Sequence, residues 1–184
     1  MDFITQFCSA AEAVGTQVIS CKSLQQAVDY IVEQVDGTLL CPSSSSGERI
    51  GLIDKLTKAG AELVTDSFRE RAPTAKAGVT GANFGIADTG TIVLESTDEP
   101  TRLASTLPEQ HFVLLDPEKI VADGIEAVAP LRDLHQLGAR NFIAYITGPS
   151  RTADIERVLT IGVHGPKKLH ILLVPGLSSD PMEN

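Results

Sequence analysis

The chain has 184 residues, 42% of them hydrophobic, which suits one globular domain with an ordinary core. Its formal net charge is -9, from 24 acidic and 15 basic residues, and no basic stripe interrupts it, so nucleic acid is not an expected partner. No apolar run approaches the roughly 18 residues of a membrane span, which predicts a soluble protein.

The cysteines, Cys8, Cys21 and Cys41, are too widely spaced for a CxxC pair or for a four-ligand zinc or iron-sulfur site. We therefore expect no metal and no other cofactor in this chain. Three cysteines cannot all pair within one chain, and no basic region followed by an apolar one comes after Met1. Together these features predict a reducing, cytoplasmic location.

The first elements are a helix, a strand and a second helix. Residues 2–14 place apolar side chains at helical spacing, which predicts an amphipathic helix ending at Gly15. Val18 and Ile19 predict a short strand. Ser23 is then a candidate N-cap for the next helix, because its hydroxyl can accept a bond from an unpaired N–H in the first turn.

A second unit of the same kind follows. Thr38–Cys41 is a predicted strand, and Ile50–Ala59 a predicted helix. The serine-rich loop between them, Ser43–Gly47, could hydrogen-bond a phosphate, but it lacks the GK[ST] ending of a P-loop, and a flexible polar loop is the favoured interpretation. Ala61–Thr65 is the third strand. Strands that alternate with helices at this pace predict a parallel sheet.

A loop or short helix over residues 67–77 leads to a glycine-punctuated block, GVTGANFGIADTGTIVLES. In it, Asp88, Thr89 and Gly90 predict a turn into the strand Thr91–Glu95. Glycines let the backbone approach another backbone or a ligand closely, so both a binding loop and a plain hairpin fit the block.

Glu95 ends that strand. If the strand is parallel, its carboxylate lies where ligands bind in α/β sheets and is a candidate base or nucleophile. Alternatively, Glu95 caps the turn that follows.

The next block is LPEQHFVLLDPEKIV, in which His111 precedes the predicted strand Phe112–Leu115. A lone histidine there is usually structural, and it gains interest only if it faces the same pocket as His164. Lys119–Gln136 predicts one or two helices broken near Gly124. Leu169–Val174 is apolar enough for a central strand, and the remaining residues are predicted to form a frayed tail.

Near the C-terminal end, TGPSRTADIERVLTIGVHGP places two Gly-Pro turns around one segment. Ser150 and Thr152 are candidate N-caps for a short helix carrying Asp154 and Glu156 in its first turn, which ends at Gly162. A helix start offers unpaired N–H groups. The nearby basic side chains could add positive charge there; they are Arg151, His164, Lys167 and Lys168.

These blocks, in this order, resemble the signatures of the lactate-utilisation (LUD) domain family and its small stand-alone members. The run GPSRTADIE, followed by GVHGP and the strand LHILLV, carries the resemblance most specifically, and the two blocks from residues 78–96 and 107–121 support it. The resemblance covers most of the chain from Ala77 onward. It implies a single α/β domain over residues 1–184, with an N-terminal helix in 1–16 and a tail in 176–184.

The implied fold is a mostly parallel sheet with flanking helices, similar to the superfamily typified by glucosamine-phosphate and ribose-phosphate isomerases and CoA transferases. The implied role is in oxidising L-lactate to pyruvate, as one component of a cytoplasmic system whose iron-sulfur clusters belong to partner proteins. This chain is then an accessory, ligand-binding or assembly subunit. The expected ligand is a small carboxylate or phosphate, held by Ser150, Arg151, Thr152, Asp154, His164, Gly165, Lys167, Thr89 and Gly90.

The alternative is a free-standing acyl-CoA transferase or sugar-phosphate isomerase. Its catalytic candidates are Asp88 and Glu95, whereas His164 is the proton-carrying candidate of the first interpretation. Against this alternative, the chain has no second half for a CoA-transferase pair.

Overall fold

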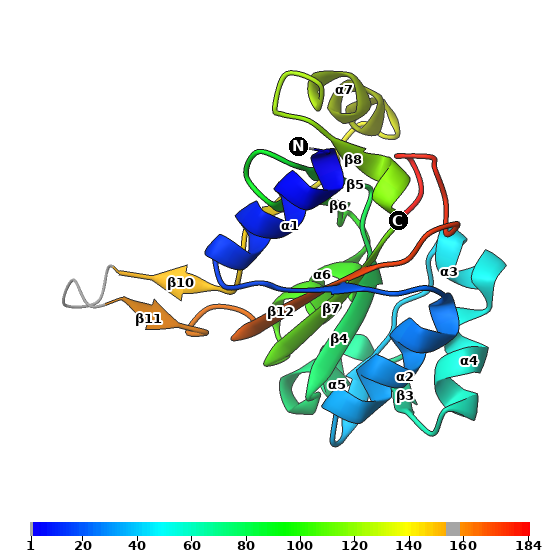
Figure 1. Ribbon diagram of the computed structural model, residues 1–184. Helices are drawn as coiled ribbons and strands as arrows, with labels where there is room; N and C mark the ends of the chain where they lie inside the picture. Colours follow the sequence, from blue (N-terminus) through cyan, green and yellow to red (C-terminus); the bar gives the residue numbers. More distant parts are fainter. Residues whose placement is uncertain (1, 154–158) are drawn as a thin grey trace.

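The computed structural model describes residues 2–153 and 159–184. Within these ranges, six strands form one parallel sheet in the order β1-β12-β7-β4-β2-β3 (Figure 1). The strands are β1 Gln17–Ser20, β2 Thr38–Leu40, β3 Glu62–Val64, β4 Ala77–Gly81, β7 Gln110–Leu115 and β12 Lys168–Leu173. The predicted α/β architecture is confirmed, and β12 is central as expected.

Short helices connect and flank these strands. They are α1 Phe3–Ala13, α2 Leu24–Gln34, α3 Ser45–Ile50, α4 Leu52–Lys58, α5 Phe68–Arg71, α6 Glu99–Thr106 and α7 Val128–Gln136, with 3-10 turns η1 Ala72–Thr74 and η2 Pro117–Lys119. Ser23 caps α2 as predicted, since its Oγ accepts a bond from Gln26 N at 3.3 Å. Every helix in these ranges is too short to cross a membrane.

Both faces of the parallel sheet are buried, because side chains alternate along each strand. On one face, Phe112 of β7 packs in a cluster with Ile31 of α2 and Leu56 of α4. On the other face, Val113 shares a cluster with Phe7 of α1. Each such fully buried apolar side chain contributes about 1.5–3 kcal/mol to folding, so the sheet and these helices form the stable frame of the molecule.

A second sheet packs against the α1 side, in the order β8-β5-β6-β9. Its strands are β5 Phe84–Ile86, β6 Thr91–Glu95, β8 Ile120–Val121 and β9 Ile143–Ile146. The prediction of a helix starting at Lys119 is wrong at β8. The β-branched pair Ile120–Val121 instead lies beside β5, where a Cβ on Gly85 would sit 3.3 Å from Ile120 Cγ1.

The helix predicted over Ile50–Ala59 is two helices. Gly51 has a left-handed φ of 64° and separates α3 from α4. The serine-rich loop is itself the start of α3, with Ser44 Oγ accepting a bond from Gly47 N at 3.2 Å. The flexible-loop interpretation of that segment is therefore wrong.

The short helix predicted after Pro149 does not begin where expected. Arg151–Thr152 forms β10, which pairs antiparallel with β11, Thr160–Ile161. The backbone of Ser150 also belongs to this pairing, since its carbonyl oxygen accepts a bond from Gly162 N at 2.8 Å. A residue held in this way cannot cap a helix. The predicted first-turn residues Asp154 and Glu156 lie outside the described residues.

Residues 175–184 are ordered by the body of the protein, so the expectation of a frayed tail is wrong. Asn83 Nδ2 donates to the Pro181 carbonyl oxygen at 2.9 Å, and Ser178 N donates to Asp116 Oδ2 at 3.1 Å. Asp116 directly follows β7, whereas Asn83 directly precedes β5. The tail therefore joins the two sheets.

Gly90 offers a test of how α1 is seated. Its φ is 64°, and a Cβ there would lie 2.2 Å from Ala11 N in the backbone of α1. We expect Gly90→Ala to lower the free energy of unfolding by about 3 kcal/mol, because α1 has to move and a side chain is forced into the left-handed region. Urea unfolding measures this, and Gly124→Ala, which meets nothing within 4 Å, is the matched control. Equal stability of the two variants would contradict this packing.

Candidate functional site

A cavity of about 240 Å³ lies beside the amino ends of the central strands β7 and β12. We call it the histidine cavity because His111 and His164 both line it. The rest of its wall comes from the end of α6, from β9 and the turn after it, and from the turn before β12; these residues are Ser105, Thr106, Ala144, Tyr145, Ile146, Thr147, Gly148, Pro149, Ser150, Gly165, Pro166 and Leu169. It is an apolar hollow with imidazole and hydroxyl groups at its wall.

His111 is held in a neutral state. Its side chain is 1% exposed, and its Nε2 lies 2.9 Å from the hydroxyl of Thr80 on the neighbouring strand β4. Burial, with a smaller contribution from His170, lowers the pKa of His111 to about 3. The imidazole is therefore uncharged at physiological pH and meets any ligand as a neutral hydrogen-bonding group. His111 lines the same pocket as His164, the arrangement that makes it a candidate for more than a structural role.

His164 and Gly165 reach the cavity because the two Gly-Pro turns close on Ser150. Ser150 N donates to the Pro166 carbonyl oxygen at 2.9 Å. A Cβ on Gly165 would lie 3.1 Å from Ser150 Cβ, so the turn packs directly on this serine. Three residues predicted for the site, Ser150, His164 and Gly165, are thus brought together, and their role in binding a ligand stays a prediction.

Of the predicted basic side chains, Arg151, Lys167 and Lys168 do not line the cavity. Arg151 Nη2 lies beside the loop glycines at the end of α1, 3.0 Å from the position a Cβ would take on Gly148. In an extended strand, successive side chains point to opposite sides, so Ser150 and Arg151 cannot face one hollow as they could at a helix start. Lys167 Nζ pairs with Glu109 Oε1 at 3.2 Å.

The remaining predicted residues of the C-terminal segment are also placed elsewhere. Lys168 is exposed at the start of β12, and Thr152 belongs to β10. Asp154 lies outside the described residues. The positive pocket expected from the sequence is therefore not formed by the part of the segment that the structure describes.

The residues of the glycine-rich block also lie away from the histidine cavity. Thr89 and Asp88 are exposed in the turn before β6, and Gly90 is packed on α1. Glu95 accepts a bond from Thr97 N at 3.0 Å and another from the Thr97 hydroxyl, so it caps a turn. Because β6 pairs antiparallel with both of its neighbours, the argument from parallel strand ends does not apply to Glu95.

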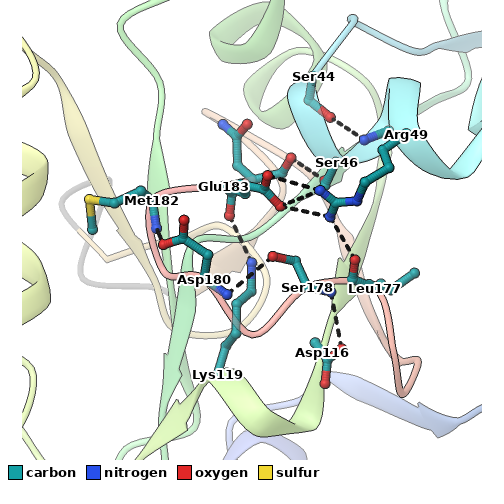
Figure 2. Close-up of polar contacts among 12 residues, drawn as sticks. Ser44, Ser46, Arg49, Asp116, Lys119, Leu177, Ser178, Asp180, Met182 and Glu183 are labelled. Carbon is teal, nitrogen blue, oxygen red and sulfur yellow. Dashed lines mark hydrogen bonds and ion pairs between the residues drawn. The ribbon is translucent and has the colours of Figure 1, made fainter.

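A second polar group, at the opposite end of β7, was missed. Asp116 and Lys119 are 1% and 5% exposed, and both line a narrow hollow under the C-terminal tail (Figure 2). The available signal was the position of Asp116 directly after an apolar strand in a parallel sheet, where ligand-binding residues gather. For Lys119, which lies in a polar stretch of the sequence, no local signal predicted its burial.

The described residues include no group of three or more His, Cys, Asp or Glu side chains that could hold a metal ion. The expectation that this chain carries no cofactor stays a prediction.

The buried histidines predict a pH dependence of stability. The pKa is lowered to about 3 for His111 and about 4 for His170, in both cases chiefly by burial, whereas an unfolded histidine titrates near 6.5. Below about pH 6.5 the unfolded chain therefore binds more protons, and the free energy of unfolding falls as the pH falls. From pH 7 to 5 we expect a loss of about 2 kcal/mol per histidine, measured by urea unfolding.

A variant separates His111 from other titrating groups. His111→Gln should remove about half of the loss that the parent chain shows. An unchanged pH dependence in His111→Gln would contradict the neutral, buried state of His111.

The amino-acid sequence is similar to those of known proteins. The profile of the LUD domain matches residues 4–174. The chain is 30% identical over 181 residues to the uncharacterised protein YkgG of Escherichia coli strain K12, an alignment that covers 94% of this chain and 78% of that protein. It is also 30% identical over 189 residues to the Bacillus subtilis strain 168 protein named Lactate utilization protein C, with the same coverage of both chains.

A solved structure agrees on the fold. The DUF162 family protein of Deinococcus radiodurans superimposes with a TM-score of 0.68 at 21% sequence identity, covering 94% of this chain and 96% of that one. Because the family profile spans nearly all strands of both sheets and the relatives align over almost the whole sequence, this chain belongs to the LUD domain family.

Proposed function

We propose that this chain is a non-redox component of an L-lactate oxidation system, which binds a small carboxylate in the histidine cavity and assembles with iron-sulfur partners. The observation that carries the proposal is the 30% identity, over 94% of the chain, to a protein named Lactate utilization protein C. Within the proposed role in lactate utilisation, the histidine cavity binds the ligand and the surface beside it binds a partner protein.

The histidine cavity supports a ligand with a carboxylate and a hydroxyl. Its wall offers the imidazole of His164 and the hydroxyl of Ser150, which can donate to carboxylate oxygens and accept from a hydroxyl. Ser105 Oγ also lines it and can accept, since its own proton is donated to the Arg102 carbonyl oxygen at 3.1 Å. Three or four such bonds, at about 1 kcal/mol each, correspond to a dissociation constant near the millimolar range. A site of this strength suits a metabolite that is abundant while the system works.

A non-redox role is supported by the cysteines. The three of them lack the spacing of cluster ligands, and Cys21 and Cys41 are buried without a disulfide. Burial raises the pKa of Cys41 to about 12, so its thiol stays protonated and unreactive. Electron transfer is therefore assigned to partner proteins that carry the clusters.

A surface beside the histidine cavity is assigned to such a partner. β9 is the outer strand of the second sheet. Phe142, directly before it, is 51% exposed, and Tyr145, within it, is 55% exposed. Together with Arg102, whose guanidinium lies 5.1 Å from the ring centroid of Phe142, they line a groove next to the cavity. Exposed aromatic and arginine side chains beside an unpaired outer strand are typical of protein interfaces.

The alternative, a transferase or isomerase using Asp88 and Glu95, gains no support from the geometry. Glu95 is engaged by Thr97, and neither carboxylate lines the histidine cavity.

Growth on L-lactate tests the assignment of the cavity. In a strain lacking the chromosomal copy, His164→Ala should restore growth poorly. It should also weaken the binding of L-lactate to the purified protein about fivefold, the effect of losing one hydrogen bond. Arg151→Ala, which changes the same segment but not the cavity wall, should behave like the parent chain. If the His164→Ala chain supports normal growth at unchanged thermal stability, the histidine cavity has no part in lactate utilisation.

Affinity purification from lactate-grown cells tests the partner surface. The tagged parent chain should co-purify with iron-sulfur proteins, and Phe142→Asp should lose them because a charge enters the interface. The Phe142 side chain is exposed and does not line the histidine cavity, so this change is tolerable for folding, which circular dichroism checks. Equal recovery of partners with both chains would place the interface elsewhere.

A further inference from the structure

The carboxyl ends of the parallel strands carry a second site, at the far end of β7 from the histidine cavity. Its wall combines the start of α3, the end of β4 and the residues after β7; these are Ser44, Ser46, Gly47, Gly81, Asp116 and Lys119. Open α/β sheets bind ligands outside the carboxyl ends of their strands. Here that position is covered by residues 177–184 of the tail (Figure 2).

Lys119 is the unusual group in this wall. Its side chain is 95% buried, yet none of the ion pairs among the described residues includes it. Its Nζ donates at 2.7 Å to the main-chain carbonyl oxygen of Glu183. Burial lowers its pKa to about 8, although the nearby carboxylates of Asp116, Glu183 and Asp180 oppose the shift. A buried ammonium without a contacting carboxylate is costly, which suggests a position suited to an anionic ligand.

At its last two residues, Glu183 and Asn184, the tail meets the wall with oxygen acceptors, and the wall supplies the donors. Besides Lys119, the Ser46 hydroxyl donates to the Asn184 carbonyl oxygen, and Arg49 donates to both carboxylate oxygens of Glu183, at 2.9 and 2.7 Å (Figure 2). A Cβ on Gly81 would lie 2.3 Å from the carbonyl carbon of Asn184, so the tail lies directly on the strand end. About 10 Å³ of the hollow stays open, no more than one water occupies.

We propose that this is a second ligand site, for a small carboxylate, and that Glu183 and Asn184 occupy it as a displaceable internal ligand. A carboxylate placed on Lys119 and Ser46 accepts the bonds that the main-chain oxygens of Glu183 and Asn184 now accept, and brings a negative charge into direct contact with Lys119. The tail can leave because its main ionic contact is accessible to solvent. Arg49 and Glu183 are 48% and 26% exposed, so water and dissolved salt compete for this pair.

Competition between tail and ligand has a measurable size. If the tail covers the site nine-tenths of the time, the apparent dissociation constant of the ligand is about ten times its intrinsic value. Loosening the tail therefore tightens binding. The double variant Asp180→Ala with Glu183→Ala does this in the full chain, since it removes the turn bond from Met182 N to Asp180 and the contact with Arg49.

The experiment is calorimetric titration with pyruvate, with inorganic phosphate as the comparison anion. Every chain also carries His164→Ala, so that binding in the histidine cavity, and hence the fate of the proposed function, is separated from this site. We expect the loosened-tail chain to bind pyruvate about fivefold to tenfold more tightly than the chain with the parent tail. Adding Lys119→Met should abolish that binding, while replacing the exposed Lys58 by methionine should not change it.

A second measurement reports the tail itself and needs only the parent tail. Amide exchange at Ser178 and Met182, whose N–H groups bond to Asp116 and Asp180, should become faster when pyruvate saturates the site. If the double variant does not fold, Glu183→Gln replaces it and should tighten binding severalfold. Equal affinity of loosened and parent tails, retained binding with Lys119→Met, slower exchange on saturation, or binding of phosphate without pyruvate would each overturn the proposal.

Discussion

Strand β7 determines the geometry of this molecule, because it is hydrogen-bonded to β12 on one side and β4 on the other and is buried on both faces. A strand so enclosed has one acceptable register, since a shift by one residue would exchange every side chain between the two faces. That register places Phe112 toward α2 and α4 and Val113 toward α1. It also fixes His111 at one end of the strand and Asp116 at the other.

The two candidate sites follow from this single strand. His111 opens on a hollow built by the turns before β12 and after β9, with its charge removed by burial. Asp116 and Lys119 follow the carboxyl end, where the tail keeps the Lys119 ammonium from solvent. In a chain with a net charge of -9, enclosed donor groups of this kind can attract a small anion although the surface as a whole repels large ones.

Local chemistry predicted most of the frame. The cap at Ser23, the apolar runs that became β2, β7 and β12, and the alternation of helix and strand were readable because each depends on neighbours in sequence. Gly51 illustrates a limit: the glycine is visible in the sequence, but its left-handed conformation, which ends one helix and begins another, is not.

The site was predictable only in part, because its shape depends on contacts between distant segments. The two Gly-Pro turns around Ser150 indicated that His164 and Gly165 come close to it. Whether Arg151 begins a helix or a strand was decided by its partner Ile161, which the local sequence does not specify. The tail is the clearest case, since its polar residues are typical of disorder and are ordered by Asn83 and Asp116 from far along the chain.

The position of the tail also has a mechanical consequence. Asn184 Nδ2 donates to the carbonyl oxygen of Glu95 at 3.1 Å, and Glu95 is the β6 residue opposite Ile143 of the outer strand β9. The same few residues thus clamp the end of the parallel sheet to the sheet that carries the exposed aromatic face. A molecule that displaces the tail therefore changes the stiffness of β6 and β9 together. By thermodynamic reciprocity, a protein that binds β9 changes how readily the tail leaves its site.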